Sequence, residues 1–236
     1  MTILRLWLLA MTLLALSGCD ALIGVGDASY RFRMTVEVET PKGLKRGSSV
    51  YEVSAGSRTK ILPDARASKV TSIGEAVALD IAPGRTLFAL LKNGTPSGTM
   101  AELSMTTLDK GFGTSHRAMV STAEELEARG AGGPPAAVDP EHYPMLVTFG
   151  DLKDPSSVEK VDPDDLAASF GEGVTIKRIT VQLTDDPVTT GIERRLGWLP
   201  NYYDKMLDGN RLNRIDAKNG FANSLSQDSF AKGTIQ

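Results

Sequence analysis

The chain has only one cysteine among its 236 residues, Cys19. A single cysteine cannot form a disulfide within the chain, and it cannot supply the two or more thiolates of a structural zinc site. Basic residues are not in excess either, since 26 Lys and Arg face 29 Asp and Glu for a formal net charge of −3. Non-specific binding to nucleic acid therefore lacks its usual electrostatic driving force, and we expect no nucleic-acid partner.

Motifs for catalysis and cofactor binding are also missing. The sequence contains no HExxH, GxSxG, Walker A or GxGxxG pattern, and its two histidines, His116 and His142, have no second ligand at metal-binding spacing. Ser115 directly precedes His116, but adjacent residues rarely face each other, and catalytic triads are assembled from distant segments. We therefore predict no catalytic residue, no metal ligand set and no cofactor.

Long hydrophobic runs are scarce, and the clearest one follows Arg5 at residues 6–16 (LWLLAMTLLAL). A membrane-spanning helix needs about 20 apolar residues, whereas a run of this length is typical of the hydrophobic region of a signal peptide. The alternative, a weak transmembrane helix with an incidental cysteine, is disfavoured by the length of the run and by its flanks.

The run ends in Leu16-Ser17-Gly18-Cys19, which resembles the lipobox of bacterial lipoproteins. The resemblance implies cleavage after Gly18, acylation of Cys19 by palmitate and other chains, and attachment to a membrane on its periplasmic side. Each buried CH₂ contributes about 0.8 kcal/mol, so several acyl chains anchor stably. Asp20 resembles the sorting signal that retains such proteins in the inner membrane, so we favour the inner over the outer membrane of the cell envelope.

Two segments of the mature part carry a further resemblance, residues 31–53 (RFRMTVEVETPKGLKRGSSVYEV) and 161–180 (VDPDDLAASFGEGVTIKRIT). They are similar to uncharacterised lipoproteins of alphaproteobacteria. That family has no assigned activity, so the resemblance implies no catalytic residue.

Residues 30–39 alternate between apolar and polar side chains, which predicts a strand in a sheet with one solvent-exposed face. The even-numbered residues from Tyr30 to Val38 point to one face, and the odd-numbered residues from Arg31 to Glu39 point to the other. A loop at 41–47 and a strand at 49–53 complete an antiparallel hairpin. Further strands are predicted at residues 75–81, 86–91, 143–149 and 174–183, and the strand at 86–91 is expected to be buried on both faces.

Capping patterns predict three short helices. Ser121 and Glu124 form a capping box for a helix that ends before Gly130. Residues 162–171 have Asp at the N-cap and Pro at the first helical position, and a helix with the same start is expected from Asp186 to Pro200. The predicted fold class is α+β, with antiparallel hairpins and several short helices.

The domain organisation follows from composition. We expect a signal peptide (1–18), a lipidated tether (19–29) and one globular domain (30–207) with a Gly- and Pro-rich internal loop at 130–142. That loop also permits two subdomains, 30–129 and 143–207. Residues 208–236 are polar and lack a sustained period, so we expect a loosely ordered tail.

Two groups of side chains are candidates for binding. An acidic stretch at 139–165 contains the oxygen ligands that Ca²⁺ prefers, although several of its members fit helix starts; it comprises Asp139, Glu141, His142, Asp151, Asp154, Glu159, Asp162, Asp164 and Asp165. An aromatic and basic group suits either a partner surface or a helix packed in the core; it comprises Arg194, Arg195, Trp198, Tyr202 and Tyr203.

The leading hypothesis is a membrane-anchored periplasmic lipoprotein that binds or scaffolds an envelope protein without catalysis. One alternative is a periplasmic hydrolase whose site no linear motif reveals. Another is a lipoprotein that binds a small ligand or a cation through the 139–165 stretch. A deep polar pocket that joins a histidine to a nucleophile or an acid would favour the enzyme, and a flat apolar patch at 198–203 would favour a protein partner.

Overall fold

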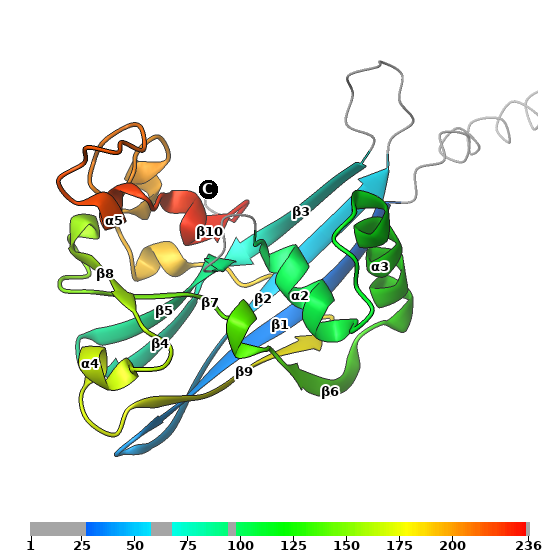
Figure 1. Ribbon diagram of the computed structural model, residues 1–236, viewed down its shortest axis with the longest axis horizontal. Helices are drawn as coiled ribbons and strands as arrows, with labels where there is room; N and C mark the ends of the chain where they lie inside the picture. The colour runs from blue at the N-terminus through cyan, green and yellow to red at the C-terminus, as the bar shows by residue number, and fades with distance from the viewer. Residues whose placement is uncertain (1–26, 58–67, 94–97, 235–236) are drawn as a thin grey trace, which may run out of the picture.

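The computed structural model describes residues 27–57, 68–93 and 98–234 (Figure 1). The predicted signal peptide, Cys19 and Asp20 lie outside these residues. The described part is a mixed fold of two antiparallel sheets and a few helices, which agrees with the predicted class in its coarse form. None of the described helices has the length and the apolar character that crossing a membrane requires.

The first sheet has six strands in the order β10 (Ala231–Lys232), β3 (Ser68–Glu75), β2 (Gly43–Ser57), β1 (Asp27–Thr40), β9 (Thr175–Leu183) and β6 (Gly132–Ala137). The second has four, β4 (Val77–Ala82), β5 (Arg85–Asn93), β7 (Pro144–Phe149) and β8 (Val158–Val161). The α-helices are α2 (Met100–Leu108), α3 (His116–Arg129), α4 (Leu166–Phe170) and α5 (Gly220–Asn223). Short 3₁₀ turns are η1 (Pro140–His142), η2 (Pro155–Ser157), η3 (Ile192–Arg194), η4 (Leu199–Tyr202) and η5 (Gln227–Ser229).

The alternating pattern of β1 is confirmed. The side chains from Tyr30 to Val38 that were expected on one face are all buried. β1 and β2 pair in antiparallel register down to Thr40 and Gly43, so the turn consists of Pro41 and Lys42 alone. The predicted loop at 41–47 is therefore mostly strand, because the pairing of β1 continues to the end of the hairpin.

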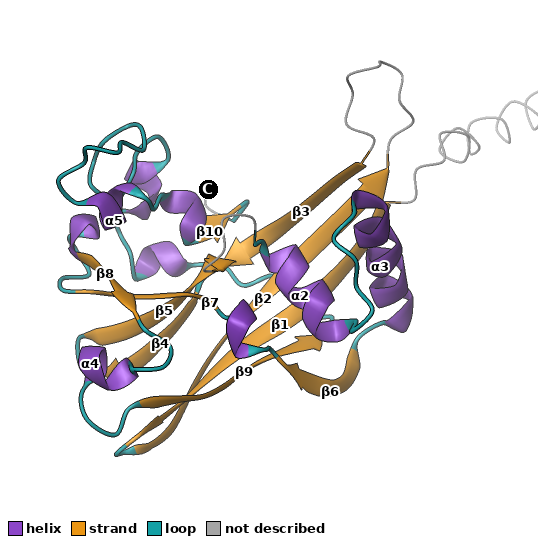
Figure 2. Cartoon of the chain, in the orientation of Figure 1, coloured by secondary structure: helices purple, strands orange, loops and turns teal. Residues whose placement is uncertain are grey.

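Two different layers cover the inner face of the first sheet, which carries the buried side chains of β1 and β2. Helices α2 and α3 pack on one end, and the second sheet packs on the other (Figure 2). The two sheets approach closely at Gly47, where a Cβ atom would lie 3.1 Å from the carbonyl oxygen of Ala78 and from Val77 Cγ1. Because Gly47 has no side chain, the two sheets can make this contact.

The outer face of the first sheet is polar. Glu37, predicted on the wet face, is nevertheless only 5% exposed because two guanidinium groups cover it. Arg178 Nε donates to Glu37 Oε2 at 2.8 Å, and Arg46 Nε donates to Glu37 Oε1 at 2.6 Å. The hydrogen bond from Arg178, together with that from Arg46, lowers the pKa of Glu37.

Residues 184–191, the crossing segment, run from β9 past β1 to β2 on this outer face. Arg31 donates to the carbonyl oxygens of Asp185 and Asp186 at 3.0 and 2.9 Å. Thr189 exchanges hydrogen bonds with the main chain of Val50, at a point on β2 that β3 does not reach. The crossing segment therefore closes part of the edge of β2.

The second sheet lies between the first sheet and residues 192–231, the C-terminal segment. The run of β5 is buried on both faces from Thr86 to Leu91, as its sequence predicts. On the side of the C-terminal segment, aromatic rings pack edge to face or tilted, with centroids 5.3–6.0 Å apart. This aromatic cluster consists of Phe88, Phe149, Trp198, Tyr202 and Phe230.

Residues 208–234 differ from the loosely ordered tail expected for 208–236. Leu225 and Phe230 are fully buried, and β10 pairs with β3 at Glu75 and Gly74. The polar residues make specific turns: the side chain of Asn223 is buried and donates to Asp208 Oδ1 at 3.0 Å. A few buried apolar side chains with turn-forming Asn and Ser between them give no sequence period, yet they fold compactly.

Two of the three predicted helices differ from the structure in their bounds. α3 begins at His116 with Ser115 as its N-cap, so Ser121 lies inside the helix, although Gly130 ends it as predicted. α4 begins at Leu166 because Asp165, and not Asp162, accepts from the main-chain N–H of Ala168 at 3.1 Å.

The predicted helix at 186–200 is absent from the described structure, which has only the 3₁₀ turns η3 and η4 there. Asp186 does not cap a helix, because its carboxylate pairs with Arg33 on the outer face of the first sheet. The predicted apolar stripe of Ile192, Leu196 and Leu199 is nonetheless buried.

The Gly- and Pro-rich loop predicted at 130–142 also contains a strand. Residues 132–137 form β6, which pairs irregularly with β9 at the edge of the sheet, and η1 follows it. Proline lacks an N–H donor and is tolerated at such an edge, which explains Pro134 and Pro135 in a strand.

Candidate functional site

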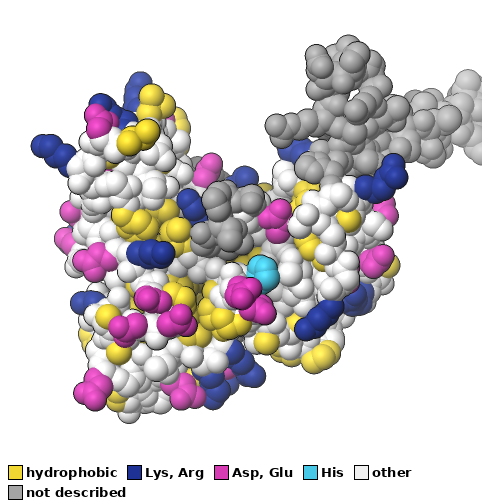
Figure 3. All heavy atoms as spheres, viewed as in Figure 1, with side chains coloured by type: hydrophobic (Ala, Val, Ile, Leu, Met, Phe, Trp, Pro, Cys, Tyr) yellow, Lys and Arg dark blue, Asp and Glu magenta, His cyan; other side chains and the backbone are white. Residues whose placement is uncertain are grey.

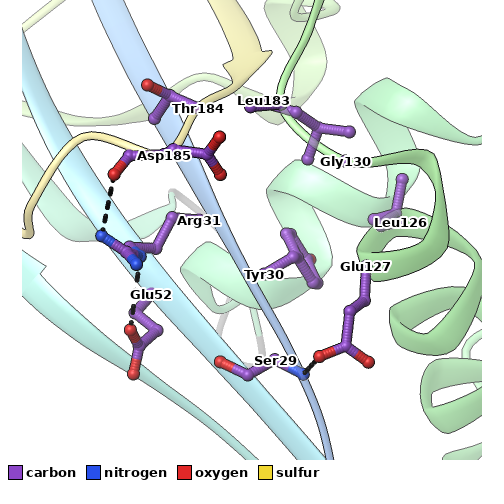
Figure 4. Close-up of a pocket in the computed structure, with 11 residues that line it drawn as sticks. Ser29, Tyr30, Arg31, Glu52, Leu126, Glu127, Gly130, Leu183, Thr184 and Asp185 are labelled. Atoms are coloured by element: carbon purple, nitrogen blue, oxygen red, sulfur yellow. Dashed lines mark hydrogen bonds and ion pairs between the residues drawn. The ribbon is translucent and has the colours of Figure 1, made fainter.

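A pocket of about 300 Å³ opens at the end of the first sheet where β1 begins (Figure 4). Its walls come from the start of β1, the end of β9 and the C-terminal end of α3. The lining residues are Ser29, Tyr30, Arg31, Glu52, Leu126, Glu127, Gly130, Ala131, Leu183, Thr184 and Asp185. The pocket thus joins three carboxylates and one guanidinium over a small apolar floor.

The polar groups of this pocket mostly bind one another. The main-chain N–H of Ser29 donates to Glu127 Oε1 at 3.1 Å, and Arg31 lies 3.6 Å from Glu52 and donates to the carbonyl oxygen of Asp185 (Figure 4). Arg31 is therefore engaged in holding the crossing segment. What the arrangement offers a ligand is an acidic rim with hydrogen-bond acceptors.

Tyr30 does not supply an activated group to the pocket. Its hydroxyl lies 2.7 Å from Ser104 Oγ, and Ser104 itself donates to the carbonyl oxygen of Ala101, so the tyrosine is the donor of this buried pair. Burial raises the pKa of Tyr30 far above its ordinary value of about 10. The phenol stays protonated at neutral pH and acts as a structural hydrogen-bond donor.

A second polar group lies inside the core. Glu75 is 1% exposed, and its carboxylate accepts from the main-chain N–H groups of Gly191 at 3.0 Å and Ile192 at 2.8 Å. Ser49 Oγ and Tyr51 Oη are also buried and have no partner among the described residues. Burial, and in addition the nearby charge of Glu75, raises the pKa of Tyr51. Glu75 thus ties the end of β3 to the main chain at residues 191 and 192.

The aromatic and basic candidate residues do not form one exposed surface. Arg195 donates to both oxygens of Asp80, at 2.6 and 3.1 Å, and Trp198 lies in the aromatic cluster and donates from Nε1 to the carbonyl oxygen of Leu152. Tyr202 packs on Trp198, whereas Tyr203 is 79% exposed and Arg194 is exposed. The structure uses Arg195 and Trp198 to fasten the C-terminal segment to the second sheet.

The acidic stretch is dispersed along turns. Asp139, Asp154 and Asp165 each cap a helix or 3₁₀ turn by accepting a main-chain N–H. Within residues 27–57, 68–93 and 98–234, no three His, Cys, Asp or Glu side chains are grouped to hold a metal ion.

His142 lines none of the described pockets. His142 belongs to η1, and its Nδ1 is buried without a partner among the described residues. His116 is the first residue of α3. None of the described pockets therefore brings His142 together with a nucleophile or an acid.

A groove that the sequence did not predict lies beside β3. A pocket of about 190 Å³ separates this strand from α2 and α3, and its lining residues are Val70, Thr71, Ser72, Thr99, Ala101, Glu102, Met119 and Lys232. In the view of Figure 3, a notch separates the C-terminal segment from the helix-covered end of the first sheet.

Comparison with protein-family models, curated proteins and solved structures found no match for this chain.

Proposed function

We propose that the protein is a lipid-anchored, periplasm-facing protein of the cell envelope that binds a protein partner and catalyses no reaction. The observation that carries the proposal is the sequence Leu16-Ser17-Gly18-Cys19 after a hydrophobic run of signal-peptide length. The binding part is supported by the pocket of about 190 Å³ that lies between β3 and the helices α2 and α3.

Anchoring at Cys19 would hold the fold close to the bilayer. β1 begins at Asp27, eight residues after Cys19, and an extended chain of that length reaches about 28 Å at most. The strand registers place Asp27, Gly56 and Lys69 in one row across β1, β2 and β3. The pocket at the start of β1 and the groove beside β3 would thus both lie at the membrane-proximal end.

Metabolic labelling tests the anchor. Labelled palmitate should enter the full-length wild type and not Cys19→Ser, and the wild type should sediment with membranes while the variant is released. Equal labelling of the two proteins would overturn the lipid anchor. Separation of inner and outer membranes, with Asp20→Ser as the comparison, tests the proposed retention in the inner membrane.

A further inference from the structure

β3 has one side that no described residue covers along most of its length. β2 pairs with β3 through Ser68–Ile73, whereas β10 pairs on the other side only at Gly74 and Glu75, and Gly233 follows it beside Ile73. The two-residue turn between β1 and β2 determines which main-chain groups of β2 face β1 and which face β3. Given the register between β2 and β3, the N–H and C=O groups of Val70 and Ser72 then point away from β2. No hydrogen bond from a described residue reaches these groups.

A side-chain pocket lies directly against this uncovered side. Val70 and Ser72 are opposite Ala55 and Val53, so their side chains belong to the inner face that α2 and α3 cover. The pocket of about 190 Å³ is floored there by Ala101 of α2 and Met119 of α3. An edge with unpaired main-chain groups and an adjacent pocket is the arrangement by which proteins bind extended peptides.

We propose that the uncovered side of β3 binds an extended segment of a partner polypeptide, which adds a strand beside Ser68–Ser72 and places one aliphatic side chain in the pocket between β3 and α2. The proposal rests on the partner-binding function proposed above and specifies the chemistry of the partner. It does not depend on the lipid anchor.

The occupant follows from the groups that it must satisfy. Val70 and Ser72 each present one main-chain N–H and one C=O group, and another β-strand has main-chain groups at the same two-residue spacing to bond them. β10 already pairs antiparallel at the same side of β3. The carboxylate of Glu102 and the hydroxyl of Thr99 are both used in the capping box of α2. The remaining wall is apolar or hydroxyl-bearing and suits an aliphatic side chain.

The test uses the full chain in detergent micelles and phage-displayed random peptides as the probe. Selected peptides are synthesised, and amide hydrogen exchange is followed by NMR. We expect the amides of Val70 and Ser72 to exchange readily in the unbound protein and to slow by about tenfold or more with a selected peptide. The same peptide N-methylated at alternate residues, which lacks the needed N–H donors, should give no protection.

Two substitutions at one position supply the matched control. Ser72→Pro removes an N–H that points away from β2 and should weaken peptide binding by about tenfold or more, whereas Ser72→Ala keeps the N–H and should bind as the wild type does. If Ser72→Pro does not fold, the comparison of the two peptides on the wild-type protein decides.

Three results would overturn the proposal. They are the selection of no peptide that protects Val70 and Ser72, protection that survives N-methylation, and protection without peptide that grows with protein concentration. The last would show that two copies of this chain pair at β3. Loss of palmitate labelling at Cys19 alone would remove the anchor and leave peptide binding unchanged, so the two failures are distinguishable.

Discussion

The buried carboxylate of Glu75 accepts a hydrogen bond of 2.8 Å from the main-chain N–H of Ile192, 117 residues further along the chain. Glu75 is the last residue of β3, and Ala76 alone separates it from the second sheet. Ile192 begins η3, at the start of the C-terminal segment. One side chain thus joins the first sheet, the passage to the second sheet and the segment that covers the second sheet.

Removing this carboxylate is expected to destabilise the protein strongly. Glu75→Ala leaves two buried N–H donors without an acceptor and should lower the free energy of unfolding by about 3 kcal/mol or more, measured by urea titration. Glu75→Gln keeps one acceptor oxygen and should cost less, about 1–2 kcal/mol. Glu124→Ala, at an exposed position of α3, serves as the control. A cost for Glu75→Ala no larger than for the control would show that the contact contributes little.

The charge of Glu37 should make stability depend on pH. Its hydrogen bonds from Arg178 and Arg46 lower its pKa in the folded protein below the unfolded value of about 4.3. The carboxylate therefore adds stability above the unfolded pKa, and this contribution is lost as the pH falls through the folded pKa. We expect Glu37→Gln to cost about 1 kcal/mol at pH 7, because both arginines are more than half exposed.

Urea titrations of the wild type and Glu37→Gln between pH 7 and pH 2 test this prediction. The difference between the two proteins should shrink below about pH 4.5. Glu39→Gln, which breaks a half-exposed pair with Lys177, should cost less than about 1 kcal/mol at pH 7. A difference between wild type and Glu37→Gln that grows toward low pH would contradict the assigned ion pairs.

Phe230 should be an essential core residue although it lies near the end of the described chain. Its ring is fully buried among Phe88, Phe149 and Trp198. Phe230→Ala should therefore lower the free energy of unfolding by about 3–5 kcal/mol. Ile215→Ala, at a fully exposed position, should change it by less than about 0.5 kcal/mol. Similar unfolding curves for the two variants would mean that the C-terminal segment does not belong to the core.

Gly74 should tolerate no side chain. Its φ angle is +148°, and a Cβ atom would lie 2.5 Å from Tyr51 Cδ1, which is closer than real Cβ contacts. Gly74→Ala should cost about 2 kcal/mol or more in the free energy of unfolding, because the fully buried ring of Tyr51 would have to move. Gly197→Ala meets no atom within 4 Å and serves as the matched control. Equal midpoints of urea unfolding for the two variants would refute this prediction.

The sequence predicts an element well where its pattern of apolar residues fits only one kind of secondary structure. The alternation of β1 and the continuous apolar run of β5 are such cases, since one or both faces of a strand are buried. Ile192, Leu196 and Leu199 were assigned to a helix because their spacing fits its period. Two 3₁₀ turns joined by a bend bury the same three side chains, so the spacing alone did not determine the element.

The capping box predicted at Ser121 does not mark the start of α3. The helix begins earlier, with Ser115 as its N-cap, and the residues before Ser121 include the buried Met119 and Val120. The groove beside β3 had no sequence signal, because an uncovered strand side is defined by which strands fail to pair with it. Its alternation at Val70 and Ser72 is also too weakly apolar to mark a strand from the sequence.

The order of strands in the first sheet also determines when the protein can fold. β1 lies between β2, its neighbour in the chain, and β9, which begins more than a hundred residues later. β10, among the last described residues, pairs with the end of β3 at Gly74 and Glu75. A chain that emerges N-terminus first can form the β1–β2 hairpin early. The apolar face of this hairpin, however, is covered only after almost the whole polypeptide has been synthesised. Such distant pairings are typical of domains that fold in milliseconds to seconds, so a nascent or truncated chain would depend on chaperones to keep that face from aggregating.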